Sequence, residues 1–567
     1  MIEFLTVFAL AIVLGWPLGH YLAAVMRGTP MRGDRLFGLV ERPLYRLLGV
    51  NPGQGMDWKA YAGAFLLSNL VLAVLVMAVF MTQAWLPLNP DHAPNMRWDL
   101  ALHTTVSFLT NTNQQHYSGQ AQLSWLAQMS AIVGLQVVTP MMGLALVVAT
   151  LRGLFGGRRA EASGAAVGGR ADVGNYFADV IRPAVRVLLP LCLLWSLLLT
   201  WQGVPSTLHG GPDAVPVDAS AGMASQHIPL GPVAPMVAVK QLGTNGGGWY
   251  GPNSAVPLEN PTPFSNVLET LAIILLPVSV AFMVGAFTRR RKFTALVFGS
   301  MLLMSLASAG LSMWSEAHTV TGTGLAAMEG KETRFGLEPS ALWAAVTTQT
   351  SNGSVNAMHD SLSPLTGMVA ICNMLINAIW GGVGCGLQQF LVYLLLTVFL
   401  AGLMTGRTPE LFGRKIEARE VKLLAVLVLL QPLVLLGLTA ITLAVPAITA
   451  NSNPGFHGIS QVFYEFASAF ANNGSGFEGL GDNTYWWNLS CALVLAVGRY
   501  PALILPLVIA AGLAVKRAAP EGTGTLRVET PTFALTLIAV IVILTVLQFM
   551  PVLVLGPIAD HLALQAL

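Results

Sequence analysis

The sequence predicts an all-α integral membrane protein with ten transmembrane helices. The expected arrangement is four helix–pore-loop–helix repeats around a pseudo-fourfold axis, with one extra helix at each end. Composition is the first reason: of 567 residues, 54% are hydrophobic and 10% are charged, against about 25% charged in a typical soluble domain. The second is segment length, since a spanning helix needs about 20 mostly apolar residues. Ten segments reach it, at roughly 2–25, 59–85, 122–151, 177–201, 264–287, 293–315, 365–404, 420–446, 486–515 and 531–556.

The two outermost segments and the four repeats between them define the expected organisation. Residues 1–25 and 531–556 form the extra N-terminal and C-terminal helices, and the pore repeats cover 59–151, 177–287, 293–404 and 420–515. The first segment is expected to stay in the protein as a helix rather than act as a signal peptide. Its start carries Glu3 and no positive charge, and no small-residue cleavage site follows.

Basic residues are concentrated in every second connection between the segments. The connections after the first, third, fifth, seventh and ninth segments hold 24 of the 29 Lys and Arg residues, among them Arg158, Arg159 and the basic run 289–292. By the positive-inside rule these connections are cytoplasmic and both termini are extracytoplasmic. The basic run is expected to contact anionic lipid or the cytoplasmic domain of a partner.

The third reason lies in four of the outward connections. Each contains a short and moderately apolar segment that ends in asparagine followed by glycine or threonine. The asparagines match one another across the four segments, and with the residues after them they are Asn111-Thr112, Asn245-Gly246, Asn352-Gly353 and Asn473-Gly474. One Asn-Gly pair alone usually marks only a turn. Four pairs at the same place in a repeated unit, on the same face of the membrane, predict pore loops around one cation filter.

The chemistry of these loops favours a monovalent cation. Irregular backbone at membrane depth survives only where it lines a cavity that holds water or ions. Glycine, and to a lesser degree asparagine, adopts positive φ and can turn successive carbonyl groups toward a common axis. Rings of carbonyl oxygens replace the hydration shell of a monovalent cation, whereas carboxylate rings are typical of other cation pores. No carboxylate occupies the aligned positions.

The sequence contains no motif that indicates an enzyme active site or a transition-metal site. There is no GxxxxGK[ST] phosphate loop and no Asp-Lys-Thr-Gly phosphorylation motif, so this chain is expected to have no catalytic site. The histidines show no metal-ligand spacing. The cysteines, Cys192, Cys372, Cys385 and Cys491, show no CxxC spacing and are expected to be packing residues. Potassium is the expected ligand, with no transition-metal site.

Several long strings resemble the KdpA family, the potassium-binding subunit of the bacterial Kdp potassium-transporting ATPase. They are 241–248 (QLGTNGGG), 259–262 (ENPT), 357–361 (AMHDS), 402–410 (GLMTGRTPE) and 463–475 (FYEFASAFANNGS). The resemblance implies a potassium-channel-like fold in the bacterial inner membrane. It also implies as partners the P-type ATPase subunit KdpB, which binds ATP, and the single-span subunits KdpC and KdpF. Potassium would pass through the filter and an intersubunit tunnel into KdpB, where ATP hydrolysis drives uptake.

Carried over residue by residue, the resemblance implies a potassium filter and one neighbouring side chain. Gln115 matches a glutamine close to the filter in the family; an amide that only stabilises the loop is the alternative. Asp99 and Glu465 lie in the pore half-helices and are expected to anchor them rather than to contact the ion. The implied filter residues are Thr110, Asn111, Thr112, Thr244, Asn245, Gly246, Ser351, Asn352, Gly353, Asn472, Asn473 and Gly474.

Below the filter, the seventh apolar segment is too long for one simple span. Gly381, Gly382, Gly384 and Gly386 interrupt it, and each glycine costs a continuous helix about 1 kcal/mol relative to alanine. We expect an intramembrane loop that acts as a gate; close helix packing through small residues is the alternative. Asn377 stands where the family commonly has a glutamate, which leaves its role open.

Arg499 is the only basic residue deep within an apolar segment. A charge inside the membrane is a functional hypothesis by default, and here it would stop potassium from running straight through to the cytoplasm. An ion pair or a snorkelling side chain is the alternative.

Two other functions compete with a pump subunit. A self-sufficient potassium transporter of the Trk or Ktr type has four repeats but eight spans, so the two extra helices count against it. A membrane scaffold with vestigial pore loops would show no ion dependence.

Overall fold

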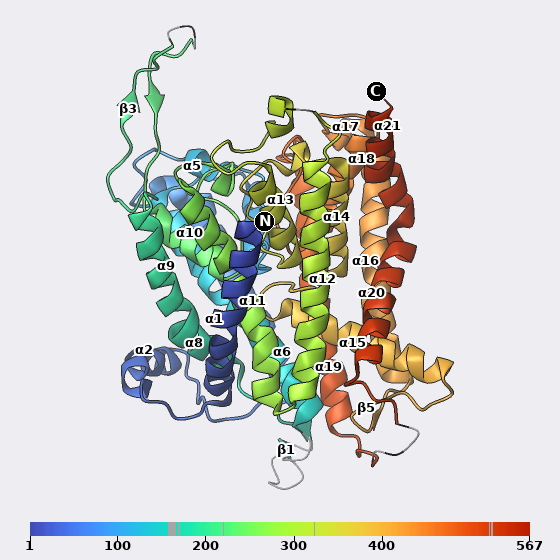
Figure 1. The fold of residues 1–567 in the computed structure, drawn as a ribbon. Helices are drawn as coiled ribbons and strands as arrows, with labels where there is room; N and C mark the ends of the chain where they lie inside the picture. Colours follow the sequence, from blue (N-terminus) through green and yellow to red (C-terminus); the bar gives the residue numbers. More distant parts are fainter. Residues whose placement is uncertain are drawn as a thin grey trace.

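The computed structural model describes the chain except residues 157–165, 168–169, 219, 221, 323, 521, 523–524 and 567. Two of the arginines predicted to be cytoplasmic, Arg158 and Arg159, lie outside the described residues. The fold is helical, with three two-stranded hairpins in the connections (Figure 1). The hairpins pair β1 (Ala166–Val167) with β2 (Arg170–Ala171), β3 (Asp213–Ala214) with β4 (Gln226–His227), and β5 (Glu410–Leu411) with β6 (Arg414–Lys415).

Within the described residues, ten helices are long and apolar enough to cross a membrane, as the sequence predicts. Most begin and end within a few residues of the expected bounds. Three contain a short π-helical stretch: η2 (Ala127–Ile132) precedes α6, η3 (Ala184–Leu188) joins α8 to α9, and η8 (Val554–Ile558) joins α20 to α21. The ten are α1 (Ile2–Arg27), α3 with η1 (Trp58–Trp85), η2 with α6 (Ala127–Phe155), α8 to α9 (Tyr176–Trp201), α11 (Pro263–Thr288), α12 (Arg291–Ala317), α15 (Cys385–Met404), α16 (Ala418–Ala444), α19 (Tyr485–Ala514), and α20 to α21 (Pro531–Gln565).

The seventh apolar segment is not one helix. It divides into α14 (Pro364–Ile376) and α15, and the residues between them form a loop. Helix α14 ends at Asn377, which adopts the left-handed conformation at φ 45°. Of the four glycines, Gly381, Gly382 and Gly384 have positive φ in the loop, whereas Gly386 lies in the first turn of α15.

Four shorter helices precede the four predicted pore loops. They are α4 (Trp98–Leu109), α10 (Val233–Leu242), α13 (Leu337–Gln349) and α18 (Phe456–Ala471). Each follows one long helix and precedes the next, so the helix–pore-loop–helix unit repeats four times. Figure 1 shows α10, α13 and α18 in the half of the bundle that also holds both chain termini, with α2, β1 and β5 at the opposite end.

Burial separates central helices from peripheral ones. The most apolar window is 78% buried in α6 and 83% buried in α11, but only 22% buried in α3 and 28% buried in α16. The central helices therefore surround the pore loops, while the peripheral ones expose leucine and valine side chains to the membrane. The extra helix α1 lies so close to α11 that a Cβ on Gly15 or Gly19 would collide with residues 278–283. Small residues permit such close approach.

One helix was not predicted. Helix α2 (Asp34–Leu47) buries Glu41 and Tyr45 and exposes Leu36 and Leu39, as a helix lying in a membrane interface does. The side chain of Arg186 holds it, with Nη1 2.6 Å from Asp34 Oδ1 and Nη2 2.9 Å from Glu41 Oε2. The remaining short elements are α5 (Gly119–Gln122), α17 (Pro446–Thr449), η5 (Asn253–Ala255), η6 (Gly324–Met328) and η7 (His359–Ser361).

A histidine ties the C-terminal helix to the pore loops. In the first turn of α18, His457 lies between Asp360, at Nε2–Oδ1 2.9 Å, and Asp560 of α21, at Nδ1–Oδ2 3.0 Å. Burial by itself lowers the pKa of His457, but hydrogen bonds to the two carboxylates outweigh it and raise the pKa to about 9. The imidazolium therefore stabilises the folded state.

This contact predicts a pH-dependent stability. Because the folded-state pKa is raised above an unfolded value of about 6.5, the contribution of His457 is complete below that pH and is lost as the pH rises through about 9. We expect His457→Gln to show a smaller fall in melting temperature between pH 6.5 and 9.5 than the unchanged protein, measured by tryptophan fluorescence in detergent. His318→Gln, at an exposed histidine, is the control. An unchanged pH slope in His457→Gln would contradict the role.

Candidate cation filter and the cavity below it

The four pore loops share one backbone pattern. In each, a residue with positive φ follows the pore helix directly or after one residue, then comes a residue with ordinary φ, then a second with positive φ. The left-handed region is unusual for residues other than glycine, so this alternation identifies equivalent positions. The first set is Asn111, Thr244, Ser351 and Asn472, at φ 50° to 60°, and the second is Asn113, Gly246, Gly353 and Gly474, at φ 57° to 104°.

Hydrogen bonds show that the predicted correspondence between the first loop and the other three is shifted by one residue. The amide of Asn245 donates to the carbonyl five residues earlier, and the amides of Asn352 and Asn473 do the same. In the first loop the equivalent donor is Thr112, which bonds to Ser107 O at 3.0 Å. Matching Asn111 with the other three asparagines was therefore wrong. The equivalent triplet is residues 111–113, which adds Asn113, while Thr110 lies at the end of the pore helix.

The loops close into a ring. A Cβ on Gly246 would collide with the backbone of Asn352, and one on Gly353 would collide with the backbone of Asn473. A Cβ on Gly474 would collide with the backbone of Thr112. Loop 2 thus lies against loop 3, loop 3 against loop 4, and loop 4 against loop 1, in chain order around one axis.

The middle residue of each triplet carries a carbonyl oxygen that has no hydrogen-bond donor. Within the described part of the chain, no N–H or O–H donates to the oxygens of Thr112, Asn245, Asn352 or Asn473, although all four residues are buried. Buried carbonyl groups are rarely left unpaired. A ring of such oxygens suits a partly dehydrated monovalent cation, and the C-terminal ends of the four pore helices favour positive charge there.

The asparagines at the middle positions of loops 3 and 4, Asn352 and Asn473, have ordinary φ and serve as braces through their side chains. Asn352 donates from Nδ2 to Lys240 O at 3.0 Å, and its Oδ1 accepts from Ser354 N at 2.9 Å. Asn473 repeats the arrangement with Thr347 O at 2.9 Å and Ser475 N at 3.0 Å. Each amide therefore fixes one loop to the pore helix of the preceding repeat.

Loops 1 and 2 are joined more densely. Asn111 donates to Thr244 O at 3.0 Å, and Asn113 donates to Gly246 O at 2.8 Å. Gln115 makes two bonds to one residue: Nε2 donates to Gly248 O at 3.0 Å, and Gly248 N donates to Oε1 at 2.7 Å. Both polar atoms of the Gln115 side chain therefore bond to the backbone of Gly248. The residue also lines the outer cavity.

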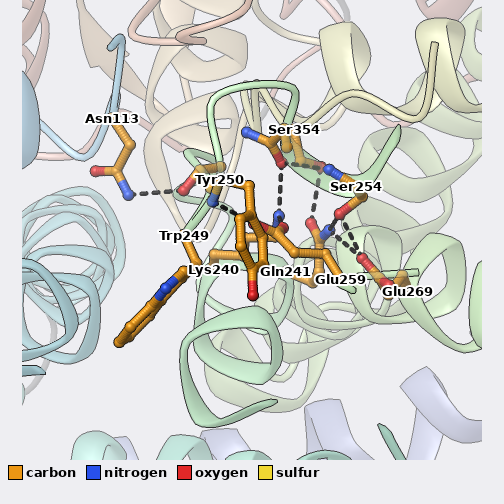
Figure 2. A network of polar contacts seen from close by, with 12 residues as sticks. Asn113, Lys240, Gln241, Trp249, Tyr250, Ser254, Glu259, Glu269 and Ser354 are labelled. Atoms are coloured by element: carbon orange, nitrogen blue, oxygen red, sulfur yellow. Dashed lines mark hydrogen bonds and ion pairs between the residues drawn. The ribbon is translucent and has the colours of Figure 1, made fainter. Parts of the chain in front are cut away.

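Behind loop 2 lies a buried ion pair that the sequence did not suggest (Figure 2). Lys240, on the last turn of α10, pairs with Glu259, and both side chains are fully buried. The carboxylate also accepts from Tyr250 N at 2.9 Å. Breaking a buried pair by removing one partner typically costs 3–5 kcal/mol, so this pair fixes the position of the pore helix strongly.

A second branch of the network joins this region to loop 3. Gln241 donates to Glu269 Oε2 at 2.8 Å and accepts from Ser354 Oγ at 2.8 Å. Ser254 Oγ donates to the same glutamate oxygen at 2.7 Å. Figure 2 shows Ser354 above Gln241, with Ser254 and Glu269 to one side.

Above the ring lies an outer cavity of about 440 Å³. Its wall includes Asn113, Gly353 and Gly474 from the filter and the acidic residues Glu465, Glu478 and Asp482. Carboxylates at the mouth of a narrow site raise the local concentration of cations.

Asp99 and Glu465, the two acids predicted to anchor pore helices, have protein partners. Asp99 pairs with Arg97 at 2.5 Å and accepts from Asn488 at 2.8 Å. Glu465 accepts from Gln114 and contacts His116 at 3.3 Å. Asp99 therefore serves as an anchor, whereas Glu465 both anchors loop 1 and faces the outer cavity.

The glycine-containing loop between α14 and α15 lies directly below loops 2 and 3. The amides of Trp380 and Gly381 both donate to Gln349 O, at 3.1 Å and 2.7 Å, at the end of α13. Val383 N donates to Thr244 Oγ1 at 3.1 Å, and a Cβ on Gly382 would lie 3.0 Å from the same hydroxyl. Gly386 packs against the backbone of Trp380, so it holds the base of the loop.

A small cavity below the ring brings together the residues singled out for the inner route. Its ceiling is formed by Asn111, Ser351 and Asn472, and its walls include Asn377, Gly381, Gly382, Cys385 and Arg499. Asn377 donates to Ala471 O at 3.2 Å and accepts from Ser351 Oγ at 2.7 Å. Arg499 is 5% exposed, and its Nη1 lies 2.7 Å from Cys385 Sγ. Among the described residues, no carboxylate pairs with it.

Comparison with known proteins identifies the family. The family model of KdpA, the potassium-transporting ATPase A subunit, matches residues 5–562. The chain belongs to the KdpA family. It is 45% identical to the potassium-transporting ATPase potassium-binding subunit of Gloeobacter violaceus over 96% of this chain and 95% of that one. It is also 45% identical to the subunit of the same name from Pseudomonas aeruginosa, over 99% and 98% of the two chains.

A more distant likeness concerns the fold alone. The potassium transporter TrkH from Vibrio parahaemolyticus superposes with a TM-score of 0.50 at 15% sequence identity, covering 88% of this chain and 97% of that one. The two chains therefore share a fold.

The ring geometry predicts the effect of adding one methyl group. Gly353→Ala forces alanine into φ 86° and against Asn473, and left-handed backbone alone costs about 1–2 kcal/mol. Since 1.4 kcal/mol is tenfold in affinity, we expect K⁺ or Rb⁺ binding to weaken by about tenfold or more, measured by isothermal titration calorimetry. Gly437→Ala, in α16 with no heavy atom near the added Cβ, should bind normally. Equal affinities in the two variants would remove loop 3 from the binding site.

Proposed function

We propose that this chain binds potassium in the four-loop ring and passes it to a separate P-type ATPase subunit that drives uptake. The observation that carries the proposal is the ring of buried, unpaired carbonyl oxygens from four equivalent loops. Family membership supplies the context, since the relatives are named potassium-binding subunits of a potassium-transporting ATPase. The filter comprises residues 111–113, 244–246, 351–353 and 472–474.

The proposed orientation puts the outer cavity and both termini outside the cytoplasm, in a bacterial inner membrane. It rests on the basic residues of the odd-numbered connections and on the acidic wall of the outer cavity. ATP binding and hydrolysis belong to the partner KdpB, with KdpC and KdpF as further subunits. This chain is the non-catalytic subunit, and potassium is its substrate.

Below the ring, the proposed route turns sideways. The cavity that holds Arg499 shares Asn377, Gln389, Gly498 and Ala502 with a second cavity, which reaches Leu427 and Gln431 of α16. Helix α16 is among the least buried of the long helices, so this direction leads to the surface of the bundle. We assign Arg499 as the charge that blocks a straight path and the glycine-containing loop with Asn377 as the gate.

The alternatives are less well supported. A self-sufficient transporter of the Trk type shares only the fold with this chain, at 15% identity, whereas the pump subunits match it at 45% over nearly their whole length. A scaffold with vestigial loops gives no reason for the buried, unpaired carbonyl oxygens.

The direct test of the proposal is purification from the native membrane with all associated subunits. We expect an ATPase activity that potassium stimulates and sodium at the same concentration does not, together with a co-purifying P-type ATPase chain. A lone chain that conducts potassium without an ATPase would favour the Trk-type alternative. A chain that binds no potassium would favour the scaffold.

The proposed role of Arg499 predicts leakage when its charge is removed. Two unit charges about 8 Å apart interact by about 2 kcal/mol at an effective dielectric constant of 20, so Arg499→Gln should raise ATP-independent potassium flux through the complex in proteoliposomes by on the order of tenfold. Arg517→Gln, at an exposed arginine beyond α19, is the control. Tight vesicles with normal coupling in Arg499→Gln would assign this arginine a structural role instead.

A further inference from the structure

Beside the filter, three side chains of different chemistry converge on one point. They are His116 from the segment after loop 1, Glu465 from α18 and Cys491 from α19, and their ligand atoms all lie within 4.8 Å of one another. All three residues are at most 2% exposed. Asp482 adds a fourth group, with Oδ2 4.0 Å from His116 Nε2. The proposed potassium route uses none of these side chains as an ion ligand.

The tautomer of His116 follows from its neighbours. Its Nδ1 lies 2.7 Å from Asn488 Oδ1. The amide of Asn488 is oriented by Asp99, whose carboxylate accepts from Nδ2 at 2.8 Å, so Oδ1 is an acceptor and His116 Nδ1 carries the proton. In neutral imidazole the other nitrogen then presents a lone pair.

That lone pair faces negative oxygens. His116 Nε2 lies 3.3 Å from Glu465 Oε1, and two acceptors at this separation repel each other unless a positive species lies between them. The surroundings therefore favour a cation at this place.

A metal ion explains more of the arrangement than a proton does. A proton between His116 and Glu465 would leave the thiol of Cys491 without a function in the cluster. Nitrogen, oxygen and sulfur donors together are the ligand set of Zn²⁺, at about 2.0–2.3 Å from the metal; tetrahedral geometry then separates the donors by about 3.3–3.6 Å. The 3.3 Å between His116 and Glu465 already meets this requirement.

The histidine is also held as metal-binding histidines are. Its second nitrogen donates to an amide oxygen that is itself fixed by a carboxylate, and such outer contacts orient the ring and set the tautomer. An entry path exists, because His116, Glu465 and Asp482 line the outer cavity.

We propose that His116, Glu465 and Cys491 form a binding site for a divalent transition metal of the Zn²⁺ class, reached from the outer cavity. The fourth position of the metal faces Asp482 and the outer cavity. Binding converts the thiol to a thiolate and releases its proton to solvent. The charges of Zn²⁺, the thiolate and the Glu465 carboxylate then cancel within the site.

The site touches the filter through one side chain. Gln114, the residue after Asn113, donates to the same Glu465 oxygen that faces His116. A metal on that oxygen competes with this hydrogen bond, so occupancy weakens a brace of loop 1. This consequence, unlike the site itself, rests on the proposed potassium function.

Cobalt is the probe that tests the site directly. We expect the EDTA-treated full chain, purified with its associated subunits, to bind one Co²⁺ per chain with a thiolate charge-transfer band, and Zn²⁺ to displace it. Cys491→Ser should abolish the band, and His116→Ser should weaken binding by about tenfold or more. Cys192→Ser, at a buried cysteine of α9, is the control. Absence of stoichiometric Co²⁺ binding, or a band that survives in Cys491→Ser, would overturn the proposal.

Two further measurements keep the outcomes distinct. Thermal unfolding establishes that each variant is folded. If His116→Ser does not fold, His116→Asn replaces it. Zn²⁺ should lower the apparent potassium affinity of the unchanged complex but not that of Cys491→Ser; equal effects on both would contradict the link through Gln114. Because the cobalt band does not require transport, it reports on the metal site even if the potassium proposal fails.

Discussion

The structure depends on a ring of backbone carbonyl groups that are buried and receive no hydrogen bond from any residue that the structure describes. An unpaired polar group in a membrane costs several kcal/mol, and four such oxygens lie at equivalent positions in the ring. Other interactions must therefore hold this geometry, and the proposed cation would supply the missing partner of the four oxygens. Positive φ on both sides of each carbonyl aims the oxygen, and the residues at these positions are glycine, asparagine, serine and threonine.

What holds the ring is a set of buried polar contacts outside it. Asn352 and Asn473 fix their loops to the neighbouring pore helices. The pair of Lys240 with Glu259 fixes α10, the pore helix that leads into loop 2 and that accepts the hydrogen bond from Asn352. A buried ion pair is weak support for stability in general because desolvation opposes it. Here the pair matters because it holds Lys240 in place, and the backbone carbonyl of Lys240 accepts the hydrogen bond from Asn352 that braces loop 3.

The sequence predicted the fold well because ten apolar segments and four loops with asparagine followed by glycine or threonine are local signals. It misplaced loop 1 because Asn111 and Asn113 flank Thr112, so that matching side chains put Asn111 where the backbone requires Thr112. The repeated need for a residue that tolerates positive φ, at every second position, would have given the correct register. The pair of Lys240 with Glu259 could not be predicted from spacing, because the 19 positions that separate them include an irregular segment without periodicity. The cluster of His116, Glu465 and Cys491 could not be predicted because it joins distant parts of the chain.

The fourfold symmetry ends directly beneath the ring, and this asymmetry supports the proposed sideways route of the ion. In the described part of the chain, only the third repeat divides its second helix. The loop after Asn377 therefore lies under loops 2 and 3, while the cavities extend toward α16. Arg499 comes from the fourth repeat and has no carboxylate partner among the described residues, which leaves a full positive charge in the remaining part of the cavity. A symmetric ring above a one-sided cavity suits an intake that delivers a cation sideways to a partner rather than a continuous pore.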